Sequence, residues 1–117
     1  MMTLDNLDIG VDIESISQFR EKDFNQNTRF YENIFTEDEI KYCLSKGNPY
    51  QHFAVRFCAK EAFIKAMDKS NISYRDIEIK MRNNKPILVH KEGAHIQGKL
   101  SLSHDKDKAI AFVVIEK

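Results

Sequence analysis

Apolar and polar residues alternate near both ends of the chain, and a helical period lies between these segments. Residues 7–13 carry an apolar side chain at every second position, with Asp8, Gly10 and Asp12 between them. Such alternation is typical of a strand with one buried face. We therefore predict a strand over residues 7–13 whose apolar side packs on the core and whose polar side, with Asp12, faces solvent.

The next segments, residues 15–19 and 25–35, lose this alternation and favour short helices. Thr36 and Glu39 have the spacing of a capping box, which predicts a helix that begins there and runs to about residue 45. The sequence Gly-Asn-Pro at residues 47–49 ends it, because glycine and proline interrupt helices.

Residues 50–69 form the longest helical segment, and apolar residues surround the predicted helix almost completely. A helix without a polar face is normally buried. It nevertheless carries four charged residues in its middle: Arg56, Lys60, Glu61 and Lys65. Glu61 and Lys65 can pair with each other one turn apart. Arg56 and Lys60 repel each other unless an anion lies between them, so this helix is the first candidate for an anion-binding element.

Alternation returns after residue 72 and predicts two hairpins. In the first, strands over residues 77–81 and 87–89 flank a turn at 83–86, where asparagine tolerates the left-handed conformation. In the second, strands over residues 99–103 and 109–115 flank a polar turn. The order of strand, helices and hairpins indicates an α+β fold, with a mainly antiparallel sheet packed on the long central helix.

Composition narrows the possible functions. The 117 residues suffice for one domain with a real core. Lys and Arg (18) balance Asp and Glu (18), so we expect neither nucleic acid nor a membrane as a partner. The apolar stretches are too short to span a membrane, and no signal peptide is evident. Cys43 and Cys58 lack the spacing of a zinc site, which together with their number favours a reduced, cytoplasmic protein.

Two carboxylates are candidate metal ligands. Asp12 lies beside Gly10, where the missing side chain would let a ligand approach the backbone. Glu61 projects from the mostly apolar helix. Asp12 could equally be ordinary surface, and Glu61 could serve only in its pair with Lys65. Together they could hold Mg²⁺, which takes one or two carboxylates, and the basic residues of the helix would then face phosphate oxygens.

One histidine adds to these candidates. His104 ends a predicted strand, directly after Ser101-Leu102-Ser103. A histidine in a turn is usually a surface residue, but the place where a strand meets a loop is also a common location for binding residues.

Three sequence blocks closely resemble the signature blocks of a known family, the phosphopantetheinyl transferases. They are G-V-D-I-E-S-I at residues 10–16, R-F-C-A-K-E-A-F-I-K-A at residues 56–66 and S-L-S-H at residues 101–104. The single-domain length and the Lys85-Pro86 pair resemble the small bacterial branch of that family. The resemblance extends over almost the whole chain.

The resemblance implies a reaction and its participants. Such an enzyme moves the 4′-phosphopantetheine group of coenzyme A to a serine of acyl carrier protein, with Mg²⁺, and supports fatty acid or polyketide synthesis. By the same resemblance Asp12 and Glu61 bind the metal, and Glu61 and Lys65 are catalytic. The residues expected to bind the coenzyme are Arg56, Lys60, Lys65, Pro86, Ser103 and His104. Because larger members join two similar halves, this single half is expected to form a homotrimer.

Two departures from the family pattern and two other hypotheses accompany this interpretation. Residues 68–72 lack the glycines that the family usually has there, and Gln18 replaces an expected basic residue that would meet the carrier. A non-catalytic module that binds coenzyme A or the carrier is one alternative. A structural α+β domain whose charged helix faces a partner subunit is the other.

Overall fold

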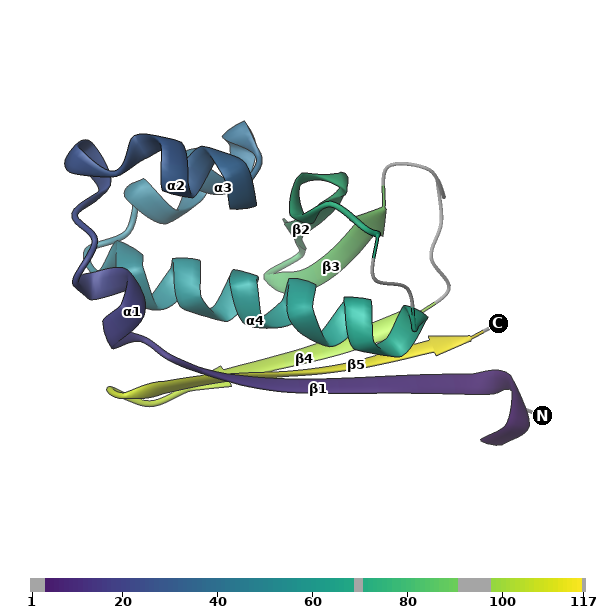
Figure 1. The fold of residues 1–117 in the computed structure, drawn as a ribbon. Helices are drawn as coiled ribbons and strands as arrows, with labels where there is room; N and C mark the ends of the chain where they lie inside the picture. The colour runs from purple at the N-terminus through teal and green to yellow at the C-terminus, as the bar shows by residue number, and fades with distance from the viewer. Residues whose placement is uncertain (1–3, 69–70, 91–97, 117) are drawn as a thin grey trace.

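The structure is a computed structural model that describes residues 4–68, 71–90 and 98–116. A long helix, α4 (Pro49–Met67), packs along one face of a three-stranded sheet, and short helices together with a two-stranded hairpin cover the other side of that helix (Figure 1). Both sides of α4 are therefore buried, as its apolar circumference predicts. The α+β prediction, with antiparallel strands packed on a central helix, is confirmed.

The strands form two antiparallel sheets. The larger has the order β1-β5-β4, with β1 (Leu7–Ser15), β5 (Lys108–Glu116) and β4 (Gly98–His104). The smaller pairs β2 (Ile77–Arg82) with β3 (Lys85–His90). Their turn uses Asn83 and Asn84 with φ of 52° and 63°, the left-handed region that asparagine tolerates. Lys85 and Pro86, predicted within the turn, already belong to β3.

Short helices hold one end of α4. They are α1 (Ser17–Arg20), α2 (Thr28–Ile34) and α3 (Glu37–Leu44). Turns of 3₁₀ helix occur elsewhere in the fold as well as among these helices, at Leu4–Asn6, Phe24–Gln26 and Tyr74–Asp76. The predicted capping box at Thr36 and Glu39 is present. Aromatic rings join these helices to α4; the rings of Tyr31 and Phe53, for example, have centroids 4.6 Å apart. Within the described residues, no helix is long and apolar enough to cross a membrane.

Helix α4 begins with Pro49 in its first turn, where the missing N–H of proline costs nothing. It ends at Asp68, whose φ of 54° is left-handed, a conformation that glycine more often takes. Of the glycine-free loop at residues 68–72, positions 69 and 70 lie outside the described residues.

The strand predicted at residues 7–13 is present, but its predicted facing is wrong. The apolar residues Ile9, Val11 and Ile13 are 63%, 49% and 61% exposed, whereas Gly10 is buried against α4. A side chain at Gly10 would come within 1.9 Å of the carbonyl oxygen of Ala62, so this glycine allows close packing of strand and helix rather than approach of a ligand. Asp12, on the same side as Gly10, points toward α4 and not into solvent.

Candidate active site

Asp12 and Lys65 meet where β1 crosses α4. Lys65 Nζ lies 3.1 Å from Asp12 Oδ1 and also donates to the carbonyl oxygen of Val11 at 3.1 Å. The Asp12 side chain is only 10% exposed, and its second oxygen, Oδ2, is buried without a hydrogen-bond partner among the described residues. An ionised carboxylate with a bare buried oxygen is costly unless a cation occupies that side.

Glu14 joins Asp12 at this place, and the sequence analysis missed it. It lies two residues along β1 and therefore on the same face, which the period of a strand could have indicated. Burial, and then a hydrogen bond with the Asp12 carboxylate that Glu14 can donate only when it is protonated, raises the pKa of Glu14 to about 7. Gln18, the residue that departs from the family pattern, donates to Glu14 Oε1 at 2.9 Å.

Glu61, on α4, lies near the carboxylates of β1. Its Oε1 accepts a hydrogen bond from the hydroxyl of Tyr74. The charge of Glu61 also contributes to the raised pKa of Glu14, so the two carboxylates lie within electrostatic reach. The predicted pair between Glu61 and Lys65 is replaced by the pair between Lys65 and Asp12.

The donor set fits a hard divalent cation. Mg²⁺ typically takes one or two protein carboxylates and completes its octahedron with water and phosphate oxygens. Among the described residues, no three His, Cys, Asp or Glu side chains form a complete metal cage. An open site that includes the unpartnered Asp12 Oδ2, with Glu61 within electrostatic reach of the neighbouring Glu14, suits a cation that shares its ligands with a substrate.

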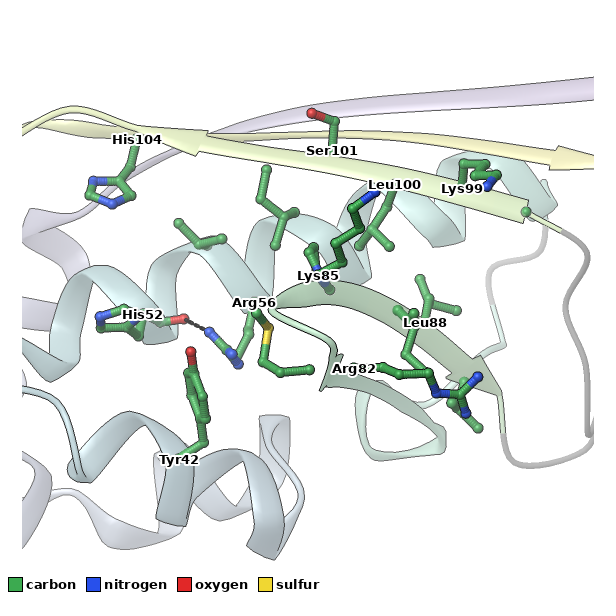
Figure 2. Close-up of a pocket in the computed structure, with 17 residues that line it drawn as sticks. Tyr42, His52, Arg56, Arg82, Lys85, Leu88, Lys99, Leu100, Ser101 and His104 are labelled. Atoms are coloured by element: carbon green, nitrogen blue, oxygen red, sulfur yellow. Dashed lines mark hydrogen bonds between the residues drawn. The ribbon is translucent and has the colours of Figure 1, made fainter.

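A cavity of about 820 Å³ opens on the other side of α4, between that helix, β3 and β4 (Figure 2). The basic residues on its wall come from these three elements and from β2. They are His52, Arg56, Arg82, Lys85, Lys99 and His104. Pro86 and Leu88 contribute apolar surface. A pocket with this mixture suits a ligand that combines phosphates with an apolar or planar part.

Arg56 is the most buried cation of this cavity. It is 3% exposed, donates to the carbonyl oxygen of His52 at 3.3 Å and lies 4.1 Å from the centre of the Tyr42 ring. Its Nε has no hydrogen-bond partner among the described residues. Burial, followed by the charges of Arg56, Lys46 and His104, lowers the pKa of His52. His52 and Tyr42 are pocket residues that the sequence analysis did not select.

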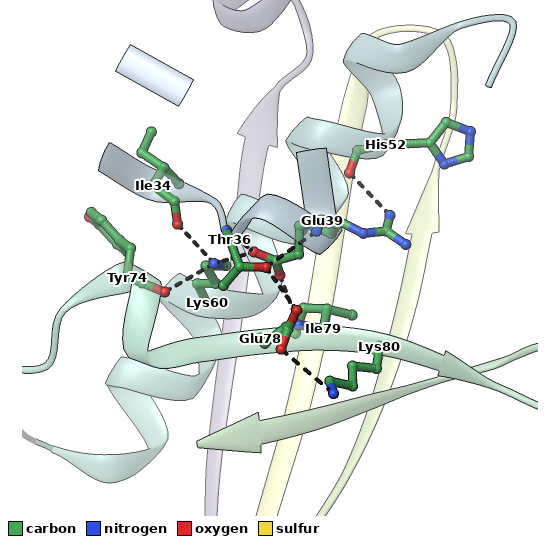
Figure 3. A network of polar contacts seen from close by, with 10 residues as sticks. Ile34, Thr36, Glu39, His52, Lys60, Tyr74, Glu78, Ile79 and Lys80 are labelled. Carbon is green, nitrogen blue, oxygen red and sulfur yellow. Dashed lines mark hydrogen bonds and ion pairs between the residues drawn. The ribbon is translucent and has the colours of Figure 1, made fainter. Parts of the chain in front are cut away.

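Lys60, which the sequence analysis expects to bind the coenzyme, does not line this cavity. Its ammonium group is fully buried and bonds Glu39 Oε1 at 2.6 Å and the carbonyl oxygens of Ile34 and Tyr74 at 2.8 and 3.0 Å (Figure 3). These three acceptors use all the hydrogens of an ammonium group. Glu39 also accepts from the backbone N–H groups of Thr36 and Ile79. Lys60 therefore needs no anion from a ligand. Glu39 is its buried counter-ion and also belongs to the capping box at the start of α3.

Ser103 also lies away from the cavity. It is paired with the exposed Ile110 of β5, on the outer face of the sheet, whereas His104 is paired with the buried Ala109 on the inner face. The structure thus brings Arg56, Pro86 and His104 to one pocket and Asp12, Glu61 and Lys65 to another place. The role of Ser103 toward the coenzyme remains a prediction.

The carboxylates and the cavity lie at opposite edges of the larger sheet. Asp12 is on β1 and His104 on β4, with β5 between them. On α4, Glu61 follows Arg56 by five residues, which corresponds to about 140° around the helix. None of the carboxylates Asp12, Glu14 and Glu61 lines the cavity within the described chain. The candidate site therefore has two halves, the carboxylate group and the basic cavity, and they open in different directions.

Comparison with known proteins gives a consistent result. Residues 8–113 match the family described as the 4′-phosphopantetheinyl transferase superfamily. A holo-[acyl-carrier-protein] synthase of Chloroherpeton thalassium is 40% identical, over 94% of this chain and 98% of the relative. One of Geotalea daltonii is 42% identical, over 92% and 96%.

Solved structures agree with the sequence relatives. A holo-(acyl-carrier-protein) synthase from Bacillus anthracis in complex with CoA (3′,5′-ADP) superposes with a TM-score of 0.81 at 32% identity, over 94% of this chain and 96% of that one. The Helicobacter pylori synthase in complex with coenzyme A gives 0.79 at 31% identity, over 92% and 99%.

Proposed function

The chain belongs to the 4′-phosphopantetheinyl transferase superfamily, and from this premise we propose that it transfers phosphopantetheine from coenzyme A to a serine of apo-acyl carrier protein. The serine hydroxyl attacks the β-phosphorus of the coenzyme diphosphate. The bond from that phosphorus to the bridging oxygen breaks, and adenosine 3′,5′-bisphosphate leaves. The observation that carries the proposal is the pairing of a carboxylate–lysine group with a separate basic pocket.

Each candidate site residue has a separate role in the proposed reaction. Arg56 and His104 hold the phosphates of the nucleotide in the cavity, where Pro86 packs against it. Lys65 offsets the charge that builds up on the transferred phosphoryl group, and the serine proton passes either to Glu61 or to a water molecule at the cation site. Phosphoryl transfer depends mainly on such positioning and charge neutralisation.

We further propose that Asp12 and Glu61 hold Mg²⁺ on the diphosphate. When bound, this ion neutralises the oxygens of the reacting and leaving phosphates. The unpartnered Oδ2 of Asp12 supports the assignment.

One experiment separates the enzyme from its two alternatives. The protein is incubated with coenzyme A, Mg²⁺ and an apo-carrier, and the carrier is then weighed by mass spectrometry. We expect the carrier to gain the mass of one phosphopantetheine group. Coenzyme binding without this gain would indicate a non-catalytic module, and neither binding nor gain would indicate a structural domain.

Replacement of Asp12 by alanine tests the cation site. We expect a loss on the order of 10³-fold in transfer rate or more, because the clamp on a polyphosphate contributes several kcal/mol to the transition state. Asp38→Ala, an exposed acid on α3, is the matched control and should transfer at the normal rate. Near-normal turnover of Asp12→Ala at ordinary Mg²⁺ concentrations would end the assignment.

We also propose a cyclic homotrimer, supported by the outer face of the larger sheet. Apolar side chains gather there although they are exposed in the single chain: Ile9, Val11, Ile13, Ile110 and Phe112. Val11 pairs with Phe112 and Ile13 with Ile110, so they form one continuous patch of the kind that marks interfaces. The two halves of the site open at opposite edges of this sheet, and a neighbouring copy can bring the missing half to each.

Phe112→Asp tests the trimer. A buried charge at the interface should dissociate the assembly, and transfer should fall with it because each site needs two copies. Light scattering measures the mass and the carrier assay measures the rate. Lys41→Asp, a charge change on the exposed side of α3, should leave the mass unchanged. A monomeric mass for the active wild-type enzyme would refute the proposal.

We place the reaction in the cytoplasm, in support of fatty acid or polyketide synthesis. Cys43 and Cys58 are both free and buried, which fits a reducing compartment. Burial raises the pKa of the Cys43 thiol to about 12, so it stays a protonated, unreactive thiol.

A further inference from the structure

Tyr74 connects the buried interior of the protein to the candidate cation site. It lies in the 3₁₀ turn Tyr74–Asp76, directly before β2, and its hydroxyl donates to Glu61 Oε1. Burial raises the pKa of Tyr74 to about 12, followed by the hydrogen bond to Glu61 and the charges of Glu61, Glu14 and Asp12. The hydroxyl therefore lies within electrostatic reach of all three carboxylates.

The position of this hydroxyl is fixed from two sides. The carbonyl oxygen of Tyr74 accepts from Lys60 Nζ at 3.0 Å, as Figure 3 shows. The ring of Tyr74 packs on Phe57 of α4 with centroids 5.4 Å apart. Since Lys60 is fully buried and also bonds Glu39 and Ile34, the backbone at Tyr74 is tied to three other elements of the fold.

We propose that Tyr74 is a positioning residue that orients Glu61 for the divalent cation. The inference rests on the cation site proposed above. Tyr74 holds Oε1 of Glu61, and among the described residues no hydrogen bond involves Oε2, which leaves that oxygen for the cation. Tyr74 does not touch the reacting atoms and acts through Glu61.

The physical reason is the freedom of a glutamate side chain. Glu61 has three rotatable bonds and lies half-buried on α4, so without a donor it samples several rotamers. A charge-assisted hydrogen bond selects one of them before the cation arrives. Removing a hydrogen-bond partner of a metal ligand typically lowers metal affinity about 10- to 100-fold.

Tyr74→Phe tests the proposal, because it removes the hydroxyl and keeps the ring on Phe57. The probe is Mn²⁺, whose free concentration is measured by electron paramagnetic resonance in the presence of coenzyme A. We expect the dissociation constant for Mn²⁺ to rise about tenfold or more. In the carrier assay, the Mg²⁺ concentration for half-maximal rate should rise similarly, and excess Mg²⁺ should restore most of the rate.

Tyr50→Phe is the matched control. Its hydroxyl accepts from the backbone N–H of Phe24 at 3.0 Å, far in the fold from Glu61, so its loss should affect stability and leave Mn²⁺ affinity unchanged. Equal Mn²⁺ affinity in Tyr74→Phe and wild type would overturn the positioning role. A rate loss that excess Mg²⁺ does not restore would also overturn it, because that points to a structural role.

The same titration distinguishes failure of this inference from failure of the cation site. If Asp12→Ala binds Mn²⁺ as tightly as wild type, the cation site itself is wrong, and the role of Tyr74 falls with it. If Asp12→Ala loses Mn²⁺ and Tyr74→Phe does not, only the role of Tyr74 is wrong. Circular dichroism of each variant shows that it is folded before the titration.

Discussion

Arg56 and Lys60 lie one turn apart on α4, and both are almost fully buried, yet the structure treats them differently. All three hydrogens of the Lys60 ammonium group meet acceptors within the protein. Arg56 makes one hydrogen bond to a backbone oxygen and stacks on Tyr42, and its Nε has no partner within the described chain. Lys60 lies inside the fold, whereas Arg56 lies on the wall of a cavity.

The comparison shows that burial alone does not separate a structural cation from a binding cation. What separates them is whether hydrogen bonds within the protein already use every donor. Lys60 has none left for a ligand. Arg56 lies on the cavity wall with its Nε unpartnered among the described residues, so we expect a bound phosphate to offset part of the cost of burying it.

The largest effect should follow from Lys60→Met. This change leaves the buried carboxylate of Glu39 without its counter-ion, and we expect unfolding free energy to fall by about 3–5 kcal/mol. Urea denaturation measures it. In Lys60→Met/Glu39→Met, which removes both charges, the loss should be much smaller than the sum of the single losses. A fully stable Lys60→Met would mean that the pair contributes nothing and that Lys60 is free for another role.

Lys65→Met extends the comparison to an exposed cation. The Lys65 side chain is 55% exposed, so losing its pair with Asp12 should cost only up to about 1 kcal/mol of stability. The transfer rate should fall about 10²-fold or more, because a cation aimed at the reacting phosphate is lost. Comparison of urea denaturation with carrier modification checks this. A large stability loss at an unchanged rate would make Lys65 a second structural lysine.

Arg56→Ala should have a smaller effect, which appears only in the stabilisation that bound coenzyme A gives. Coenzyme A that binds the native state alone stabilises wild type by about 2.7 kcal/mol at a hundredfold excess over Kd. In thermal unfolding this shift should shrink clearly in Arg56→Ala, shrink less in His104→Ala and stay normal in Lys41→Ala, an exposed control. Dephospho-coenzyme A should shift wild type less than coenzyme A does. Equal shifts from both ligands would mean that the pocket makes no stabilising contact with the 3′-phosphate.

The smallest effect concerns pH. Burial and the charges of Arg56, Lys46 and His104 lower the pKa of His52 below its ordinary value of 6.5. The unfolded chain then binds a proton at His52 more readily than the folded chain, so stability is lost as pH falls through about 6.5. We expect His52→Gln to flatten this part of the stability profile slightly. Bound coenzyme A should flatten it too, because its phosphates offset the neighbouring charges. An unchanged profile in His52→Gln would contradict the assignment.

Local patterns in the sequence predict most elements of this fold and select candidate residues for its site. The period of apolar residues, the capping box at Thr36 and the asparagine turn at 83–84 are local signals. The structure has the helices and strands that the period predicts, and it has the cap and the turn. The three sequence blocks select Asp12, Glu61 and Lys65 as site residues, and in the structure Asp12 pairs with Lys65 where β1 packs against α4.

What each charged residue faces depends on how elements that are distant in sequence pack together. Alternation shows that the two faces of a strand differ, but it does not show which face meets the helix. The patch with Val11 and Phe112 therefore lies outside, and Asp12 lies inside. Lys60 finds its partner 21 positions away at Glu39, on another helix. Such pairings depend on how elements far apart in sequence pack, and no local pattern encodes that geometry.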